Sequence, residues 1–339
     1  MYKTRNGPVM TPYRSKIKTP IVACLGEVLI DFIAEETGTL ESINSFRKHP
    51  GGAPANVAVG IARLGVATGF IGKIGADSFG NFLISVLKQN KVDTRGITQT
   101  SDAPTALAFV SRSASGDRDF LFYRNPCADI LLTESDLPQD WLTNIRYLHV
   151  GGVSLTRTPS RQATLQAVKV AQQNGAVITF DPNLRLDLWS NGLRECRAVI
   201  QSLLEYTDIF LPSHEELTTL MATDDLNRAI QRAHKKGPSI ICVKMGSKGS
   251  IISEETSKGT YRQFAQPSFS VNVVDTTGAG DGYDAGLIVG LVHGLPIEEA
   301  VLRGTAVASL VITKIGAMTA LPTKKELAHF VDAIGKTGD

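Results

Sequence analysis

Short apolar segments alternate with helix-length amphipathic segments along most of the chain, and this alternation limits the folds that it can adopt. Buried-strand patterns occur at residues 21–26, 69–75, 147–150, 177–180, 208–211 and 240–243. Segments with a helical spacing of apolar residues lie between several of them, at 54–64, 80–90 and 159–174. Strands that alternate with helices of ten or more residues favour parallel βαβ units with right-handed crossovers. We therefore expect an α/β fold with a mostly parallel central sheet flanked by helices.

One region breaks this alternation and predicts a second, smaller sheet. Two strand-like segments, 106–112 and 118–124, flank a turn at 113–117 that contains Gly116, which is typical of a β-hairpin. Residues 31–34 and 45–47 are candidates for partner strands. Such a sheet would lie outside the parallel core as a lid over the strand ends, where open α/β sheets bind ligands.

These patterns give a domain organisation. We expect one domain over residues 21–330, with lid strands from about 31–47 and 104–125, and a C-terminal tail over 331–339. Residues 1–20 carry five basic residues, three prolines and no acidic residue, so we interpret them as a flexible extension rather than a transit peptide.

Composition restricts the class of protein. Apolar residues make up 42% of the 339 residues and charged residues 20%, enough for a full globular core, and the formal charge is only +2. We expect neither a nucleic-acid partner nor a membrane partner, because both favour a concentrated basic face, and no run of about 18 uncharged apolar residues occurs. A cytoplasmic location is expected because the four cysteines form no Cys-x-x-Cys pair: Cys24, Cys127, Cys196 and Cys242.

The segment 271–282 carries the strongest indication of chemistry. An apolar stretch, expected to be a strand, leads through Asp-Thr-Thr-Gly-Ala-Gly-Asp into an apolar helix. Amides at such a helix start point outward together, and Gly278 and Gly280 leave room for a phosphate. Asp281 would repel that phosphate, so its presence favours a general base that takes a hydroxyl proton. An N-capping Asp is the purely structural alternative.

A second glycine-rich element, Gly51-Gly52-Ala53-Pro54-Ala55-Asn56, also precedes a helix. Its two glycines permit close approach of a polar ligand, and the amide of Asn56 can both donate and accept hydrogen bonds. Asp31 adds an acceptor pair suited to two vicinal hydroxyls, although a turn residue is its structural alternative.

The sequence does not match other nucleotide-binding or metal-binding motifs. Gly335-Lys336-Thr337 resembles the end of a Walker A loop, but Phe330 stands where the first glycine belongs. Tyr283 occupies the third-glycine position after Gly278 and Gly280, which disfavours a dinucleotide site. The six histidines are scattered.

The two glycine elements, at this order and separation, resemble the signatures of the ribokinase-type (PfkB) carbohydrate kinases. Within that family the sequence is most similar to bacterial and plant fructokinases. The resemblance runs from about residue 21 to 321, and its longest matching segments are 51–60, 122–129, 181–185 and 316–322.

The resemblance implies ATP-dependent phosphorylation of a sugar hydroxyl, here that of fructose to fructose 6-phosphate. It implies that Asp281 is the base and that the amides of Gly278, Ala279 and Gly280 form the anion hole. The sugar would be held by residues from the lid and the first glycine element: Asp31, Gly51, Gly52, Asn56 and Arg124.

The resemblance also implies Mg²⁺ and activation by K⁺. The loop near the nucleotide would contain Lys244, Gly246 and Gly249, together with Gly278 and Gly280. Asp275 and residues 312–317 fall where the family binds K⁺.

One departure concerns the family's Asn-x-x-Glu motif, which organises Mg²⁺ and its waters. Here Ser213 replaces the Asn and Glu216 is retained, so the sequence predicts weaker metal binding through Glu216. Ser213 as an N-cap and Glu216 as the partner in a capping box is an equally good interpretation.

Several alternatives stay open. An aminoimidazole riboside kinase or a 2-keto-3-deoxygluconate kinase would share the glycine motifs, and Arg124 or Arg185 could hold the carboxylate of the latter's substrate. A sugar-responsive regulator without turnover is the alternative outside the enzyme class. Aromatic residues on the hairpin, Phe109, Phe120 and Phe122, favour a homodimer through the lid.

Overall fold

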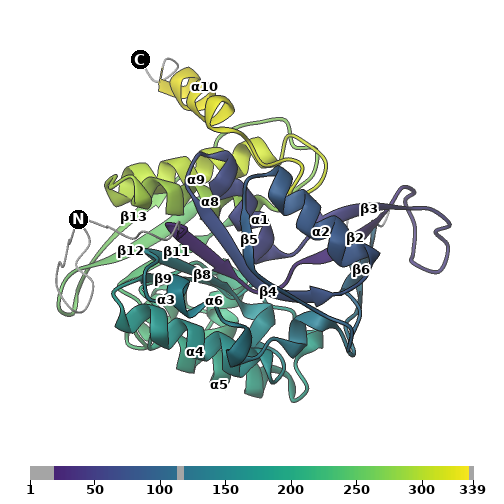
Figure 1. Ribbon diagram of the computed structural model, residues 1–339. Coiled ribbons are helices and arrows are strands. Elements are labelled where there is room, and N and C mark those ends of the chain that lie inside the picture. Colours follow the sequence, from purple (N-terminus) through teal and green to yellow (C-terminus); the bar gives the residue numbers. More distant parts are fainter. Residues whose placement is uncertain (1–18, 113–117, 336–339) are drawn as a thin grey trace.

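The computed structural model describes residues 19–112 and 118–335. Its central sheet has nine strands in the order β13-β12-β11-β10-β9-β8-β1-β4-β5. All neighbouring strands from β5 to β11 in this order are parallel. At the other edge, the pairs β11–β12 and β12–β13 are antiparallel. The expected α/β architecture is confirmed (Figure 1). The strands are β1 (Val22–Leu25), β4 (Thr68–Gly75), β5 (Asp93–Thr100), β8 (Tyr147–Gly151), β9 (Val177–Asp181), β10 (Ile209–Phe210), β11 (Ile240–Lys244), β12 (Ser250–Ser257) and β13 (Thr260–Gln266).

Helices cover both faces of this sheet because its strands are apolar on both faces. In β1, Val22 and Cys24 pack into one core and Ala23 and Leu25 into the other, as strand alternation requires. The first core is closed by α1 (Ala53–Arg63), α2 (Ser78–Gln89), α8 (Ala279–Val292), α9 (Ile297–Val311) and α10 (Lys324–Gly335). The second is closed by α3 (Gln139–Leu142), α4 (Ser160–Gln173), α5 (Gly192–Leu204), α6 (His214–Met221) and α7 (Leu226–His234).

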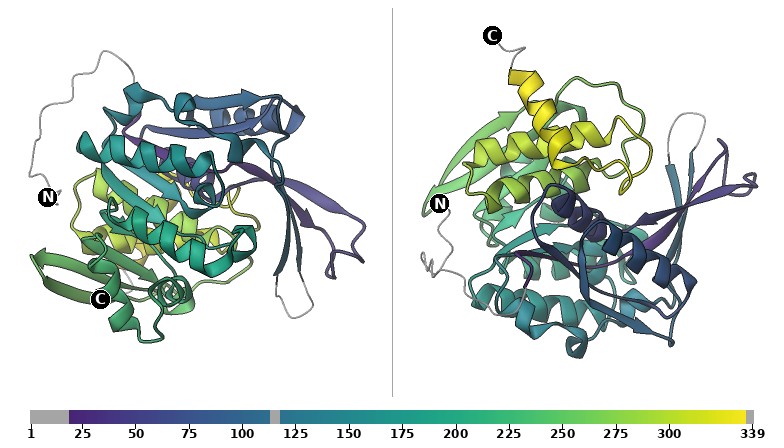
Figure 2. Two further views of the ribbon diagram at one scale, coloured as in Figure 1. Left: turned by 90° about the horizontal axis from the view of Figure 1, so that it is seen from below. Right: turned by 45° about the horizontal axis from the view of Figure 1, so that its top comes forward.

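A separate four-stranded sheet projects from the edge of the body (Figures 1 and 2). Its order is β3-β2-β6-β7, with β2 and β6 parallel and both outer pairs antiparallel. This confirms the predicted small sheet, which we call the lid; the expected turn at 113–117 lies outside the described residues. The lid strands are β2 (Leu29–Ala34), β3 (Phe46–Gly51), β6 (Leu107–Arg112) and β7 (Arg118–Tyr123).

The lid is attached to the body through aromatic contacts at its base. Phe32 of β2 stacks on Phe109 of β6, with 5.1 Å between ring centroids. Phe32 also meets Phe79 of α2 edge-on at 5.8 Å. The next residue along β2, Ile33, points to the opposite face, as does Asp31, and both line a cavity beside the body. Phe32 and Phe109 therefore lie on one face of the lid, whereas Phe122, paired with Ala108, lies on the opposite face, towards the strand ends.

The structure corrects three expectations about elements. The apolar stretch 271–274 is not a strand: the amides of Val274 and Asp275 donate to the Ile312 carbonyl at the end of α9, at 2.8 and 3.2 Å, and Val273 is 56% exposed. β5, β12 and β13 were not predicted, because polar residues interrupt their alternation. α10 continues to Gly335, into the segment interpreted as a tail. Within the described residues, we find no helix with the length and apolarity needed to cross a membrane.

Candidate active site

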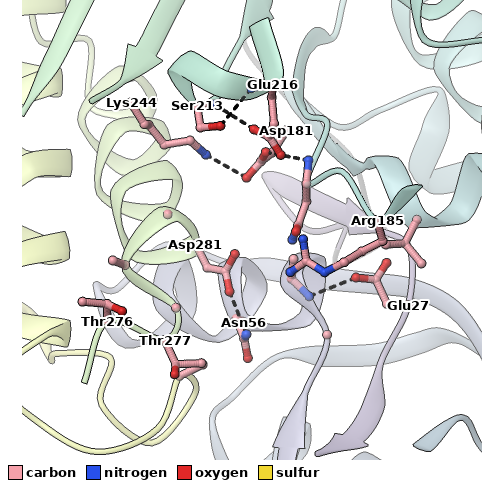
Figure 3. A pocket seen from close by; sticks show the side chains of 18 of the residues that line it. Glu27, Asn56, Asp181, Arg185, Ser213, Glu216, Lys244, Thr276, Thr277 and Asp281 are labelled. Carbon is pink, nitrogen blue, oxygen red and sulfur yellow. Dashed lines mark hydrogen bonds and ion pairs between the residues drawn. The ribbon is translucent and has the colours of Figure 1, made fainter. Parts of the chain in front are cut away.

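A cleft with a volume of about 670 Å³ lies at the carboxyl ends of the parallel strands. Parallel α/β sheets place ligands at this edge because the loops that follow the strands converge there. Asp181 ends β9, Lys244 ends β11 and Ser213 follows β10, and all three line the cleft. The start of α8, the start of α1 and the lid complete the walls (Figure 3). The fold thus gathers polar side chains from distant parts of the sequence.

The start of α8 has the geometry of an anion site. Gly278 is the N-cap residue with φ 76°, in the left-handed region, and a Cβ there would lie 2.7 Å from the Cβ of Ala317. The first intrahelical bond runs from the Gly282 amide to the Gly278 carbonyl at 2.8 Å. The amides of the preceding turn therefore lack an intrahelical acceptor, and Gly278, Ala279 and Gly280 all line the cleft. The Ala279 amide has a long contact of 3.3 Å to the Thr276 carbonyl.

Asp281 lies in the first turn of α8 and points into the cleft (Figure 3). The Nδ2 of Asn56 donates to its Oδ2 at 2.7 Å, which joins α8 to α1. Burial raises the pKa of Asp281 to about 6, against the lowering effect of the Asn56 hydrogen bond. A carboxylate with a pKa in this range can accept a proton near neutral pH, as a general base must.

The two glycines of the first glycine element make room for acidic residues. A Cβ on Gly51 would lie 1.9 Å from the Oδ2 of Asp31, and a Cβ on Gly52 would lie 2.5 Å from the backbone oxygen of Glu27. Gly52 has φ 100° and lines the cleft, whereas Gly51 is buried and does not. The close approach that Gly51 permits in this structure is to Asp31, and its contact with the sugar stays a prediction.

Asp31 also lines the cleft, from strand β2 of the lid. Burial and repulsion by Asp281 raise its pKa to about 7, and Arg185 acts in the opposite direction. Two carboxylates on facing elements thus share one end of the cleft.

Arg124 follows β7 directly and is 7% exposed. Its guanidinium forms a buried ion pair with Asp129 and lines the cleft, as the sequence predicts for a residue that arrives from the lid. Burial opposes the charge of Arg124, but Asp129, Cys127 and Glu27 outweigh this and raise its pKa. The cation is therefore held in place before any ligand binds.

Lys244 belongs to a buried charge cluster rather than to an open loop. Its Nζ donates to Asp181 Oδ2 at 2.8 Å (Figure 3). The same Nζ lies 3.5 Å from Asp284 Oδ1. A Cβ on Gly280 would lie 3.4 Å from the same Nζ, so the cation sits beside the start of α8. Its charge contributes to the positive potential there, and nucleotide contact by Lys244 stays a prediction.

The glycines of the loop after Lys244 differ in position. Gly246 lines the cleft with φ 58°. Gly249 does not line it; with φ 90°, it lets the loop pass the backbone of β13, where a Cβ would lie 2.0 Å from the Gln266 carbonyl. Contact between Gly249 and the nucleotide stays a prediction.

Ser213 and Glu216 form the capping box that the sequence offered as an alternative. Ser213 Oγ accepts from the Glu216 amide at 3.2 Å, and Glu216 Oε2 accepts from the Ser213 amide at 2.7 Å. Glu216 Oε1 accepts from the Leu184 amide at 2.7 Å. Burial and the nearby Asp181 raise the pKa of Glu216.

The residues present fit Mg²⁺ only as a partly hydrated ion. The part of the chain that the structure describes holds no group of three or more His, Cys, Asp or Glu side chains suited to a metal. Glu216 and Asp181 line the cleft, and each oxygen in use keeps a further lone pair. Mg²⁺ commonly binds through one or two carboxylates, waters and substrate phosphates, which this donor set allows.

Asp275 lies next to the loop 312–317, as the sequence predicts. Its Oδ1 accepts from the Thr277 amide and hydroxyl at 3.0 and 2.7 Å, and its Oδ2 accepts from the Gly316 amide at 2.9 Å. Asp275 is buried and borders a second cavity, of about 630 Å³, behind Asp31. K⁺ binding at this loop stays a prediction.

Three residues of the cleft region were missed as site residues: Glu27, Asp181 and Asp284. Arg185, which the sequence offered only as a partner for a substrate carboxylate, also lines the cleft. The sequence carried a signal for two, because Glu27 and Asp181 stand at or after the carboxyl ends of apolar strand patterns. Asp284 stands three residues after Asp281, on a helix that is apolar on every side, where a buried carboxylate needs a partner.

Comparison with known proteins agrees with this geometry. Residues 20–324 match the pfkB family of carbohydrate kinases. The chain belongs to this family. The family assignment confirms the resemblance seen in the sequence and the phosphotransferase class, with an alcohol group as acceptor.

Individual pfkB family members resemble the chain over nearly its whole length. It is 38% identical to a probable chloroplastic fructokinase-6 of Arabidopsis thaliana, over 94% of this chain and 84% of that protein. A sugar kinase of Pyrococcus horikoshii in complex with ATP has a TM-score of 0.81 and 35% identity, over 91% and 97% of the two chains. A fructokinase double mutant of Vibrio cholerae O395, bound to fructose, ADP and potassium, has a TM-score of 0.81 and 30% identity, over 93% and 99%.

Proposed function

We propose that this pfkB family kinase is a fructokinase, which transfers the γ-phosphate of ATP to the 6-hydroxyl of fructose in the cytoplasm. Residues 21–330 would act as one catalytic unit. The observation that carries the proposal is the pairing of Asp281, with a pKa near 6, with the open amides at the start of α8. The likeness to fructokinases of plants and bacteria favours fructose as the acceptor.

In this proposal, the residues of the chain align and polarise the reactants. Asp281 takes the proton of the attacking hydroxyl, and the amide of Asn56 fixes the direction in which that carboxylate points. The amides and dipole at the start of α8 hold the phosphoryl group that is transferred, with the Lys244 cation beside them. Phosphoryl transfer needs mainly this alignment and charge stabilisation.

The sugar would lie between Asp281 and the lid. Asp31, Gly52 and Asn56 bound this end of the cleft, and Arg124 adds a cation that can donate to sugar oxygens. Closure of the lid over the sugar would exclude water, which otherwise competes as the acceptor.

We propose that the enzyme uses two cations, Mg²⁺ and K⁺. Bound Mg²⁺ would neutralise charge on the phosphates, and Glu216 and Asp181 would hold its waters. K⁺ would occupy the loop 312–317 beside Asp275, since backbone carbonyls and a carboxylate suit a hard cation, and a potassium-bound fructokinase shares this fold.

A homodimer through the lid is also proposed. Leu121 and Tyr123, on the lid face that carries Phe109, are 45% and 60% exposed, and the ring of Tyr123 packs against Phe109. Exposed apolar groups on a projecting sheet favour a second copy of the chain as their cover. Sedimentation velocity should give a dimer, and Tyr123→Arg should shift it towards monomer; a monomeric wild type would contradict the proposal.

ADP release from ATP and Mg²⁺ tests the function. The acceptors are fructose, glucose, ribose, aminoimidazole riboside and 2-keto-3-deoxygluconate, each with and without K⁺. Fructose should give the highest kcat/KM, and K⁺ should raise it. Preference for the 2-keto acid would assign Arg124 and Arg185, which both line the cleft, to its carboxylate. ATP binding without turnover on any acceptor would favour a regulator instead.

A further inference from the structure

Buried polar atoms without a hydrogen-bond partner gather at one end of the cleft. Among the described residues, these atoms include Glu27 Oε2, Asn56 Oδ1 and Arg124 Nε, and all three residues line the cleft. Glu27 is 4% exposed, Asn56 4% and Arg124 7%. Folded proteins rarely leave such groups unsatisfied, so a cluster of three at one site indicates a polar ligand.

Glu27 is built into this wall with one oxygen fixed and one open. The Ala53 amide, at the start of α1, donates to Glu27 Oε1 at 3.1 Å. Gly52 makes room for the backbone of the residue, because a Cβ there would lie 2.5 Å from the Glu27 carbonyl oxygen; a Cβ on Gly151 would lie in ordinary contact with Oε2, at 3.7 Å. The packing therefore holds Oε2 in a fixed position without supplying its partner.

Arg124 complements this open acceptor with an open donor. Its ion pair with Asp129 uses Nη2 and leaves Nε without a partner. Glu27 and Arg124 attract each other electrostatically across the wall. One acceptor and one donor of opposite charge match the hydrogen-bonding capacity of a hydroxyl or of two neighbouring sugar oxygens.

The positions of Glu27 and Asp281 relative to α1 separate their roles. The Ala53 amide holds Glu27, and Asn56 holds Asp281. Ala53 and Asn56 are three residues apart on one helix face, about 4.5 Å along the axis. Figure 3 shows Asp281 beside Asn56 and Glu27 farther along the cleft, with the side chain of Arg185 between the two carboxylates in this view. A sugar whose reacting hydroxyl lies at Asp281 would extend towards Glu27 with its other end.

We propose that Glu27 is a specificity-determining residue that contacts the sugar directly. Its Oε2 accepts a hydrogen bond from a hydroxyl at the end of fructose remote from carbon 6, on carbon 1 or carbon 2, and Arg124 Nε donates to an oxygen of the same end. The inference rests on the proposed function, because phosphorylation at carbon 6 defines which end is remote.

The test compares fructose with two analogues, 1-deoxyfructose and 2,5-anhydromannitol, which lack the hydroxyl on carbon 1 and carbon 2 respectively. Wild type and Glu27→Gln are assayed for kcat/KM with each acceptor; Glu299→Gln, an exposed position on α9, is the matched control. The wild type should lose roughly tenfold to a hundredfold with the analogue that lacks the contacted hydroxyl. Glu27→Gln should have a lower kcat/KM for fructose than the wild type. Its ratio of kcat/KM for fructose to that for the analogue should be about tenfold smaller than in the wild type. The control variant should behave as the wild type does.

The outcomes separate this inference from the proposed function. Equal discrimination by wild type and Glu27→Gln would overturn the contact. So would an equal loss on all three acceptors, because that result assigns Glu27 only to packing at the start of α1. Thermal unfolding and ATP binding of the variant verify that it folds. A wild type without fructose turnover would overturn the proposed function, and this inference with it, before any variant is compared.

Discussion

The two ends of the cleft hold their carboxylates in opposite ways. At the end beside β9 to β11, both oxygens of Asp181 and of Glu216 accept hydrogen bonds, from backbone amides and from Lys244. At the end beside the lid, Asp281 and Glu27 each have one described hydrogen bond, and Asp31 has no side-chain partner among the described residues. Carboxylates whose oxygens all accept hydrogen bonds form a rigid, preorganised wall. Carboxylates with an oxygen that lacks a partner can still bind a ligand.

The pKa shifts separate Asp181 from the carboxylates beside the lid, while burial raises the pKa of Glu216 at the satisfied end as well. Lys244 outweighs burial and lowers the pKa of Asp181, so that carboxylate stays charged. Burial without a matching cation raises the pKa of Asp281 to about 6 and that of Asp31 to about 7. Perturbed carboxylates of this second kind cluster at sites of proton transfer and hydroxyl binding. Under the proposed function, the fold would prepare the end that binds the phosphates, and the substrate would complete the end that binds the sugar.

The largest expected effect comes from removing the base at the open end. Asp281→Asn keeps the shape of the side chain but cannot accept the proton, so kcat should fall by about 10²- to 10⁴-fold. Equilibrium dialysis with ATP should show nearly unchanged nucleotide binding. Turnover near the wild-type value would contradict the assignment of Asp281.

The next largest effect tests the satisfied end through stability. Lys244→Met leaves Asp181 and Asp284 buried without their cation, which should destabilise the fold by about 3–5 kcal/mol. Lys314→Met is the matched control, because the Lys314–Glu326 pair is nearly half exposed; it should cost about 0–1 kcal/mol. Urea unfolding measures the free energy of unfolding of both variants. Equal losses of stability would contradict the expected difference between the buried and the exposed ion pair.

A third prediction uses pH to distinguish open from satisfied carboxylates. The folded pKa of Asp31 is raised to about 7 from 3.8, so its contribution to stability is full below about pH 4 and is lost as pH rises through 7. The stability of Asp31→Asn relative to the wild type should therefore increase between about pH 4 and pH 7, by on the order of a few kcal/mol in the free energy of unfolding.

Asp136→Asn supplies a control of opposite sign. Hydrogen bonds from Lys73 and Thr133 outweigh burial and lower the pKa of Asp136, so its contribution is present at neutral pH and is lost as pH falls. This variant should be less stable than the wild type at pH 7. Urea titrations of both variants across pH measure the two slopes; slopes of the same sign would contradict the account.

The smallest effect concerns the helix cap at the satisfied end. Ser213→Ala removes the acceptor for the Glu216 amide and should cost about 1 kcal/mol, while Ser213→Asn should restore it. Asp225→Ala, which removes the N-cap of α7, should cost a similar amount far from the cleft. Only the Ser213 variants should change the Mg²⁺ concentration needed for half-maximal rate; an equal shift in Asp225→Ala would remove that link.

The sequence predicted the fold where local patterns and tertiary structure agree. The buried parallel strands that were found are mostly apolar, and the two strands of the lid hairpin are strand-like segments separated by a turn pattern. The edge strands β12 and β13 carry polar residues on their exposed face, and the stretch 271–274 is apolar without a neighbouring strand to pair with. Pairing partners, which decide such segments, are not visible along the chain.

The part of the candidate site that could be predicted consists of residues that belong to sequence motifs. Asp281, Asn56 and Arg124 reach the cleft as expected. Gly51 and Gly249 do not line the cleft and instead approach Asp31 and the backbone of β13, because a glycine indicates close approach without saying which atoms approach. Glu27 was missed because its significance depends on the amide of Ala53, 26 residues away, and on an oxygen left open.

Identification of the product tests the central claim most directly. Fructose and ATP are incubated with the wild type and with Asp281→Asn, and the phosphorylated sugar is identified by ³¹P and ¹³C NMR. We expect one equivalent of fructose 6-phosphate for each ADP in the wild type, and almost none in the variant over the same time. Release of ADP without a sugar phosphate, or phosphate on another hydroxyl of fructose, would contradict the account.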